Sequence, residues 1–205
     1  MKSFSKLMGE QNLLPIIQAN SAEEGVNIAN AMFKAGLRLV EVVLRTDASL
    51  EALAAIKKAL PEIIVGAGTV TNEKILNKAI NAGADFIVTP AVSEKLLGHL
   101  VNCPIPVLPG VSNTGDILLA SEFGFTEMKL FPASLSGGAP FLSGVSSVFQ
   151  NIKFCPTGGV TQTNKSEYLS LTNVFAVGGT WVARKDWVEN EDWEAVFHAC
   201  QLAQH

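Results

Sequence analysis

The chain has 205 residues, 48% of them hydrophobic and 17% charged, a composition typical of a compact globular domain with a large core. Its formal net charge of −4 comes without a basic stripe, which argues against nucleic acid as a partner, and no apolar run approaches the ~20 residues that span a bilayer. The N-terminal segment lacks the apolar stretch of a secretory signal and three scattered cysteines imply no disulfide framework, so the expected compartment is the cytoplasm.

Short apolar runs alternate with amphipathic helical segments along the whole chain. Apolar residues recur at helical spacing in segments such as 22–36 and 48–60, and the Ala-Gly pairs at 35–36 and 82–83 are typical of helix C-terminal caps. The expected strands are, in chain order, 13–19, 37–44, 62–68, 85–90, 105–110, 125–131, 151–156 and 173–179.

Eight strands with intervening helices predict a (β/α)₈ barrel, or TIM barrel, preceded by a short N-terminal helix. No linker or low-complexity stretch divides the chain, so residues 1–205 are expected to form one barrel domain. An open doubly wound sheet is the alternative, although no glycine-rich dinucleotide fingerprint follows the first strand. In a barrel, function is expected at the carboxyl ends of the strands and in the loops that follow them.

A lysine interrupts the apolar pattern of the sixth expected strand, within the segment EMKLFPA (127–133). Alternation places Glu127, Lys129 and Phe131 on one face of this strand. If that face is interior, burial disfavours the ammonium form of Lys129 and favours the neutral amine that a Schiff-base nucleophile requires. The alternative is a lysine at an ordinary sheet edge, or one that is paired with a carboxylate for structural reasons.

The second expected strand carries both an acid and a base in VEVVLRT (40–46), and alternation places Glu41, Val43 and Arg45 on its inner face. A buried acid is costly unless it is paired or takes part in chemistry. Glu41 and Arg45 could form a structural ion pair. Alternatively, the deeper Glu41 could shuttle protons while Arg45, nearer the mouth, grips a substrate carboxylate with its planar guanidinium.

Three expected strands end in glycine-rich segments: GAGT (66–69), CPTGGVT (155–161) and VGGTW (177–181). In the first, the glycines allow close backbone approach and the hydroxyl of Thr69 is expected at the mouth. The other two diglycine segments end the last two strands, where barrels commonly bind phosphate through backbone N–H groups. Two tight turns without a ligand are the alternative.

Metal ligands are not apparent in the sequence. The histidines, His99, His198 and His205, are isolated, and the cysteines lack ligand spacing. Cys155, next to Pro156, is interpreted as a packed thiol. We therefore expect no metal and no other cofactor.

The segments LRLVEVVLRT, VGAGTV, EMKLFPA, FCPTGG and VGGTW, in this order and spacing, resemble the 2-keto-3-deoxy-6-phosphogluconate aldolase family, whose members often also cleave 4-hydroxy-2-oxoglutarate. The resemblance covers essentially the whole chain. It implies a class I aldolase, a homotrimeric barrel that cleaves a phosphorylated keto acid into pyruvate and glyceraldehyde 3-phosphate without a metal.

The resemblance also implies roles for individual residues. Lys129 would form the Schiff base and Glu41 would shuttle protons, while Arg45 and Thr69 would hold the pyruvate carboxylate. The remaining substrate contacts would be made by the pocket-lining Pro90 and Phe131, by Thr157, and by a phosphate end formed by Gly158, Gly159, Gly178, Gly179 and Thr180.

The chain departs from the family pattern at three positions. TPA (89–91) replaces the usual serine-proline-glycine or its asparagine form, Thr180 stands where serine is frequent, and Val43 stands where some relatives have threonine. These departures bear on substrate preference. The alternatives that remain open are an aldolase for the galactonate epimer, a metal-dependent class II aldolase and a non-catalytic phosphosugar-binding barrel.

Overall fold

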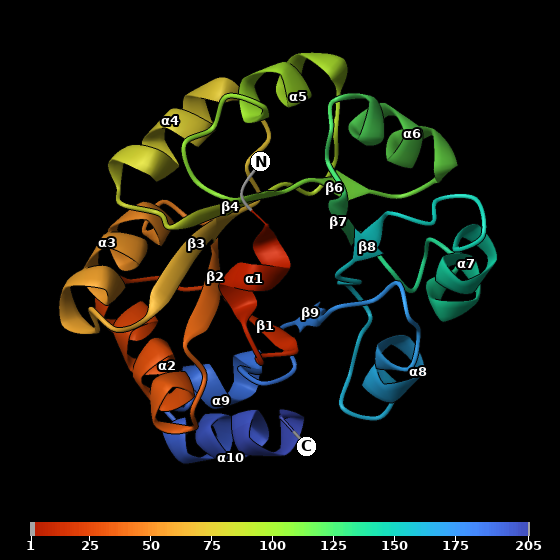
Figure 1. Ribbon diagram of the computed structural model, residues 1–205. Coiled ribbons are helices and arrows are strands. Elements are labelled where there is room, and N and C mark those ends of the chain that lie inside the picture. Colours follow the sequence, from red (N-terminus) through yellow and green to blue (C-terminus); the bar gives the residue numbers. More distant parts are fainter. Residues whose placement is uncertain (1–2, 205) are drawn as a thin grey trace.

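The computed structural model describes residues 3–204, in which parallel strands form a closed barrel surrounded by helices (Figure 1). The strands are β1 (Leu13–Ile17), β2 (Leu39–Val43), β3 (Ile64–Gly68), β4 (Phe86–Val88), β5 (Val107–Leu108), β6 (Gly110–Val111), β7 (Glu127–Leu130), β8 (Lys153–Phe154) and β9 (Val177–Gly179). The helices are α1 (Phe4–Met8), α2 (Ala22–Lys34), α3 (Ser49–Ala59), α4 (Glu73–Asn81), α5 (Glu94–Leu100), α6 (Thr114–Glu122), α7 (Gly138–Val145), α8 (Lys165–Leu169), α9 (Lys185–Glu189) and α10 (Trp193–Ala203).

The strand pairing closes the barrel and confirms the (β/α)₈ prediction over the open sheet. One run of paired strands has the order β5-β4-β3-β2-β1-β9 and the other has the order β6-β7-β8. The two runs meet where β5 continues into β6, and again where isolated parallel bridges join Phe154 to Val174 and Thr157 to Gly178. β5 and β6 are thus two halves of the fifth strand, which leaves eight strands around the ring, as predicted.

Proline explains the break in the fifth strand. Pro109 separates β5 from β6, because it has no N–H to donate to a neighbouring strand. Its carbonyl still accepts a hydrogen bond of 2.8 Å from the backbone N–H of Lys129. The strand expected over 105–110 is therefore observed as two short strands, β5 and β6, instead of one. The strands expected over 151–156 and 173–179 are longer than the observed β8 and β9.

Local sequence signals fix many of the helix ends. Ser21 caps α2 by accepting a 3.1 Å hydrogen bond from the N–H of Glu24, and Asn72, Ser93 and Asn113 play the same part for α4, α5 and α6. At the other end of α2 and α4, the predicted Ala-Gly caps are present. Their glycines adopt left-handed φ angles of 101° at Gly36 and 92° at Gly83.

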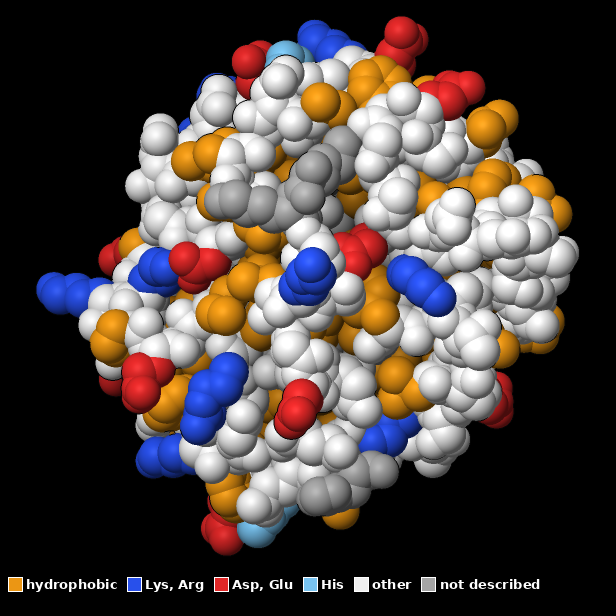
Figure 2. All heavy atoms as spheres, viewed as in Figure 1, with side chains coloured by type: hydrophobic (Ala, Val, Ile, Leu, Met, Phe, Trp, Pro, Cys, Tyr) orange, Lys and Arg blue, Asp and Glu red, His pale blue; other side chains and the backbone are white. Residues whose placement is uncertain are grey.

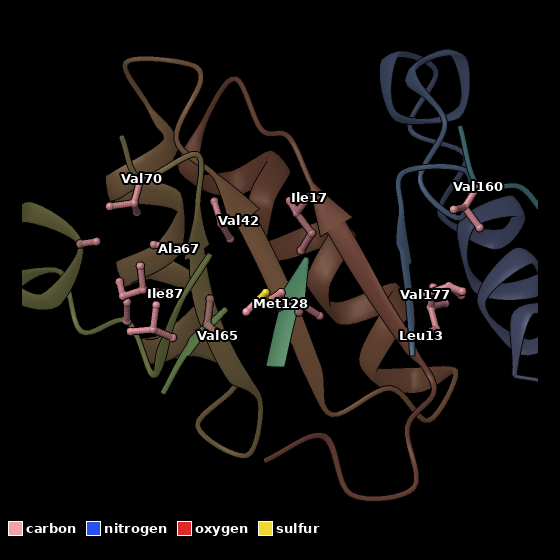
Figure 3. Close-up of a cluster of buried hydrophobic side chains, with 14 of the residues drawn as sticks. Leu13, Ile17, Val42, Val65, Ala67, Val70, Ile87, Met128, Val160 and Val177 are labelled. Atoms are coloured by element: carbon pink, nitrogen blue, oxygen red, sulfur yellow. The ribbon is translucent and has the colours of Figure 1, made fainter. Parts of the chain in front are cut away.

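Two apolar layers hold the barrel together. The larger lies between the strands and the outer helices and includes Ile17, Val42, Val65 and Met128 (Figure 3). The smaller fills the barrel interior and consists of Phe4, Met8, Leu14, Leu39, Phe86, Val88, Leu108, Cys155 and Ala176. The predicted orientation of β2 is confirmed at Val42, which belongs to the outer layer.

The short N-terminal helix α1 closes one end of the barrel, as its central position in Figure 1 shows. The ring of Phe4 meets the ring of Phe86 edge-on, with centroids 5.1 Å apart. Glu127 at the start of β7 accepts hydrogen bonds from the backbone N–H groups of Phe4 and Ser5, so this carboxylate anchors α1. Figure 2 shows this end, where acidic and basic side chains are intermixed around the helix. Across residues 3–204, no helix is long and apolar enough to cross a membrane.

Candidate active site

A buried lysine and a buried glutamate meet inside the barrel. Lys129 on β7 is 4% exposed and Glu41 on β2 is fully buried, and Nζ of the lysine lies 3.3 Å from Oε1 of the glutamate. The interpretation of Glu41 and Arg45 as a structural ion pair is wrong, because Glu41 pairs with Lys129 instead. The amine of Lys129 donates a hydrogen bond to the carboxylate of Glu41, so the two groups form a buried polar pair.

The glycines of β3 make room for large side chains of the barrel interior. A Cβ atom at Gly68 would overlap the carboxylate of Glu41, and one at Gly66 would overlap the ring of Phe86. The sequence predicts close backbone approach at this GAG segment. Its steric reason is a side chain on each neighbouring strand, which the local sequence does not reveal.

One oxygen of Glu41 has no protein partner. Among the described residues, Oε2 is buried and forms no hydrogen bond, whereas Oε1 faces Lys129. Buried carboxylate oxygens are normally satisfied, so an unpartnered one suits a group that acts on a ligand or on a water molecule. The arrangement can therefore hold a proton-accepting oxygen next to an amine.

Cys155 lies in the same interior layer and is fully buried, which confirms its interpretation as a packed thiol. Burial is the main reason why its pKa rises from 9.0 to about 12, while Lys129 lowers the pKa and Glu41 raises it. Because both groups influence the pKa of this thiol, Cys155 lies close to the amine–carboxylate pair. Its raised pKa keeps the thiol uncharged there. The local sequence gives no sign of this proximity.

Phe131 contacts Lys129, and Thr157 lies at the end of the neighbouring strand β8. The centroid of the Phe131 ring lies 5.3 Å from Nζ of Lys129, and Phe131 directly follows β7. Thr157 is buried, and its hydroxyl donates a 3.3 Å hydrogen bond to the carbonyl of Cys155. A parallel bridge pairs Thr157 with Gly178, which brings the ends of the last two strands together.

Arg45 and Thr69 meet at the ends of adjacent strands. Nε of the exposed Arg45 donates a 3.2 Å hydrogen bond to the hydroxyl of Thr69. Thr69 has a φ of 63°, an outlier for a β-branched residue, and such strain is often found at functional sites. The observed contact is consistent with the expectation that both side chains lie on the same side of the barrel.

The TPA segment has a structural role that the local sequence does not reveal. Thr89 is fully buried, and its hydroxyl accepts a 2.9 Å hydrogen bond from the N–H of Gly110 and donates one of 2.9 Å to the carbonyl of Ala91. A Cβ atom at Gly110 would collide with the backbone of Thr89 and Pro90. Gly110 on β6 is in register with Lys129 on β7. The close contact of Gly110 with Thr89 and Pro90 therefore places Pro90 beside these two strands.

The two diglycine segments differ in backbone conformation. Gly158 and Gly159 form a turn with φ angles of 92° and 79°. Gly178 and Gly179 instead belong to strand β9, where they make room for neighbours. A Cβ atom at Gly178 would strike the hydroxyl of Thr157, and one at Gly179 would strike the indole ring of Trp181.

The remaining candidates are an exposed threonine at the end of β9 and the three histidines. Thr180 follows β9 and is exposed. His99 lies 3.5 Å from Glu73 and His198 lies 3.6 Å from Glu194, whereas His205 is outside the described residues. Within residues 3–204, no three His, Cys, Asp or Glu side chains come together as a metal site.

A closed (β/α)₈ barrel with a buried amine–carboxylate pair and polar residues at the strand ends defines a barrel enzyme. The chain belongs to the KDPG and KHG aldolase family, whose model matches residues 4–199. It is therefore an aldolase, a member of the lyases.

Relatives and solved structures agree on this family. The chain is 38% identical over 184 residues to a KHG/KDPG aldolase of Escherichia coli K12, covering 90% of this chain and 86% of the relative. It is 40% identical over 201 residues to a 2-dehydro-3-deoxy-phosphogluconate aldolase of Pseudoalteromonas atlantica, and the match covers 98% of this chain and 94% of the relative.

The structure resembles a KDPG aldolase from Legionella pneumophila, in which pyruvate was captured at low pH as a covalent carbinolamine intermediate. The TM-score is 0.94 at 32% identity, over 98% of this chain and 97% of the other. A KDPGal structure has a TM-score of 0.82 at 23% identity, and that likeness shows the fold alone.

Proposed function

We propose that this chain, as one aldolase domain of residues 1–205, cleaves 2-keto-3-deoxy-6-phosphogluconate into pyruvate and glyceraldehyde 3-phosphate through an imine on Lys129. It also cleaves 4-hydroxy-2-oxoglutarate into pyruvate and glyoxylate. The observation that carries the proposal is the buried pair in which Nζ of Lys129 lies 3.3 Å from Oε1 of Glu41. The curated relatives named above support the choice of substrates.

The first step is formation of the imine. Glu41 accepts a proton from Lys129, and the neutral amine attacks the C2 ketone of the substrate to give a carbinolamine. Proton transfer from the Glu41 carboxyl to the departing hydroxyl releases water and leaves a protonated imine. The carbinolamine captured in the Legionella relative is an intermediate of this type, which supports the step here.

The second step breaks the bond between C3 and C4. The protonated imine draws electrons from this bond as Glu41 removes the proton of the C4 hydroxyl, directly or through one water molecule. The free oxygen Oε2 of Glu41 suits this task. The aldehyde leaves, C3 of the resulting enamine is protonated, and water hydrolyses the imine to release pyruvate and regenerate Lys129.

Residues around the pair bind the two ends of the substrate. Arg45 and Thr69 hold the pyruvate carboxylate, and the hydrogen bond between them supports a shared site. Pro90 and Phe131 line the pocket, and Thr157 contacts the substrate beside Lys129. The phosphate end is formed by Gly158, Gly159, Gly178, Gly179 and Thr180. The positive φ angles of Gly158 and Gly159 support this assignment, because turns of this kind can bind anions through backbone N–H groups.

The reaction is of the class I type and needs no metal or other cofactor, because the protonated imine supplies the electron sink. We further propose a homotrimer in the cytoplasm, in line with the family resemblance. The mass of the particle in solution, measured by sedimentation equilibrium, tests the trimer.

Borohydride reduction in the presence of pyruvate tests the central claim, because only an imine is trapped in this way. We expect one adduct per chain, on the peptide that contains Lys129, and no adduct in Lys129→Ala. An adduct on another lysine, or none at saturating pyruvate, would overturn the proposal. Turnover of the gluconate and galactonate epimers, measured side by side, then fixes the substrate, and we expect the gluconate epimer to be preferred.

A further inference from the structure

The end of β1 places a glutamine above the amine–carboxylate pair. Leu14 belongs to the interior layer of the barrel, and alternation along the strand turns Ile16 and then Gln18 toward the same side. Ile16 is in register with Glu41 on β2, which sets its height in the barrel. Gln18 is therefore one layer nearer the mouth than Glu41, and it is exposed.

Gln18 borders a cavity of about 500 Å³, which we name the rim cavity, between residues 16–20 and residues 180–189. The parallel pairing of β1 with β9 brings these two segments together, with Pro15 opposite Gly179. Ile16 and Thr180 both line the cavity, so it adjoins the strand ends that surround the reacting pair. Its size suits a small polyol phosphate, since ligand pockets usually measure about 300–1,000 Å³.

Most polar side chains around the rim cavity already have partners. Nε and one terminal nitrogen of Arg184 each donate a 2.9 Å hydrogen bond to Asp186. Asn20 donates from its amide to the carboxylate of Glu24 at 3.2 Å. In contrast, the side-chain amide of Gln18, the hydroxyl of Thr180 and the indole N–H of Trp181 form no hydrogen bond within residues 3–204.

The free groups are neutral, and this selects the ligand chemistry. A carboxamide offers one acceptor oxygen and two N–H donors, which together match a hydroxyl group that both donates and accepts. A phosphate group matches this cavity less well, because the amide of Gln18 is uncharged and Arg184 is already paired with Asp186. The cleaved substrate carries one hydroxyl on its aldehyde half besides the C4 hydroxyl, on the carbon next to the phosphate-bearing carbon.

We propose that Gln18 is a specificity-determining residue that hydrogen-bonds this secondary hydroxyl of the aldehyde half, through the rim cavity. The proposal rests on the aldolase function proposed above. Gln18, which directly follows β1, then helps the enzyme to discriminate between aldehydes that differ only in this hydroxyl.

The test measures aldol addition of pyruvate to two phosphorylated aldehydes in wild type and Gln18→Leu. Glyceraldehyde 3-phosphate carries the hydroxyl, whereas 3-phosphooxypropanal has the same chain length and phosphate but a methylene group in place of the hydroxylated carbon. One lost neutral hydrogen bond predicts a fall in kcat/KM of about 3- to 10-fold for glyceraldehyde 3-phosphate. For 3-phosphooxypropanal we expect a change of less than about twofold, within the scatter for surface substitutions.

Two further variants serve as controls for Gln18→Leu. Gln201→Leu on α10, an exposed glutamine away from the rim cavity, should leave both aldehydes unaffected. Gln18→Glu tests the same contact with a variant of nearly unchanged shape, and its charge should impair both phosphorylated aldehydes. An equal fall for both aldehydes in Gln18→Leu, or no fall for either, would overturn the proposal.

Trapping of pyruvate on Lys129 distinguishes a failure of the Gln18 proposal from a failure of the aldolase proposal. If both wild type and Gln18→Leu form the adduct, a failed aldehyde comparison removes the role of Gln18 and leaves the aldolase function intact. If wild type forms no adduct, the proposed function itself fails.

Discussion

Gly68 and Glu41 lie so close together on neighbouring strands that a Cβ atom at position 68 would occupy the space of the glutamate carboxylate. Gly68→Ala should therefore displace Glu41 from Lys129 and lower kcat by roughly 10²-fold, the usual contribution of a positioned acid–base group. Steady-state kinetics measure the fall in kcat, and a thermal melt shows whether the variant remains folded.

Gly98→Ala is the matched control for that variant. Gly98 lies in helix α5 and a Cβ atom there would meet no atom within 4 Å, so activity should be unchanged and stability slightly increased. A fully active Gly68→Ala would show that Glu41 does not need its observed position.

Glu41→Gln should separate proton transfer from folding. The amide has nearly the same shape as the carboxylate but cannot accept the lysine or hydroxyl proton. We expect turnover to fall by roughly 10²-fold or more, with some imine still formed with pyruvate. If Glu41 were merely structural, the melting temperature would drop while turnover per folded molecule stayed near the wild-type value.

Arg45→Lys should weaken binding of the pyruvate carboxylate. The lysine keeps the charge but loses the planar pair of donors and the hydrogen bond to Thr69. The cost should appear mainly as a higher KM for substrate and a higher pyruvate concentration for half-maximal trapping. An unchanged KM with a lower kcat would assign Arg45 to a later step.

Thr180→Asp should reveal the phosphate end. Thr180 is exposed, so a carboxylate fits there without the collision with Trp181 that a side chain at Gly179 would cause. Cleavage of the phosphorylated keto acid should suffer far more than cleavage of the shorter 4-hydroxy-2-oxoglutarate. Thr180→Asn controls for the change of shape, and equal losses on both substrates would remove Thr180 from phosphate binding.

Prolonged chelation should leave the activity unchanged, because the protonated imine replaces a Lewis acid in the proposed mechanism. The assay is aldol cleavage before and after dialysis against a chelator, followed by addition of zinc, manganese or cobalt. Activity that is lost on chelation and restored by a metal would favour the class II alternative.

Local patterns were sufficient to predict the architecture of this protein. The alternation of apolar strands and amphipathic helices predicted the barrel, and the Ala-Gly pairs predicted the caps at Gly36 and Gly83. These features depend on residues near each other in the chain, whose periodicity and backbone preferences act before any long-range contact forms. The same alternation put Lys129 and Glu41 on inward-facing positions.

The pairing inside the barrel was decided by the tertiary structure. Lys129 and Glu41 are 88 positions apart in the chain, and their contact depends on the register of strands that close the ring. The sequence left Glu41 with Arg45 as an alternative partner, because those two residues share one strand. It also could not show that Gly178 makes room for Thr157, because the steric reason for this glycine lies in a residue of the neighbouring strand.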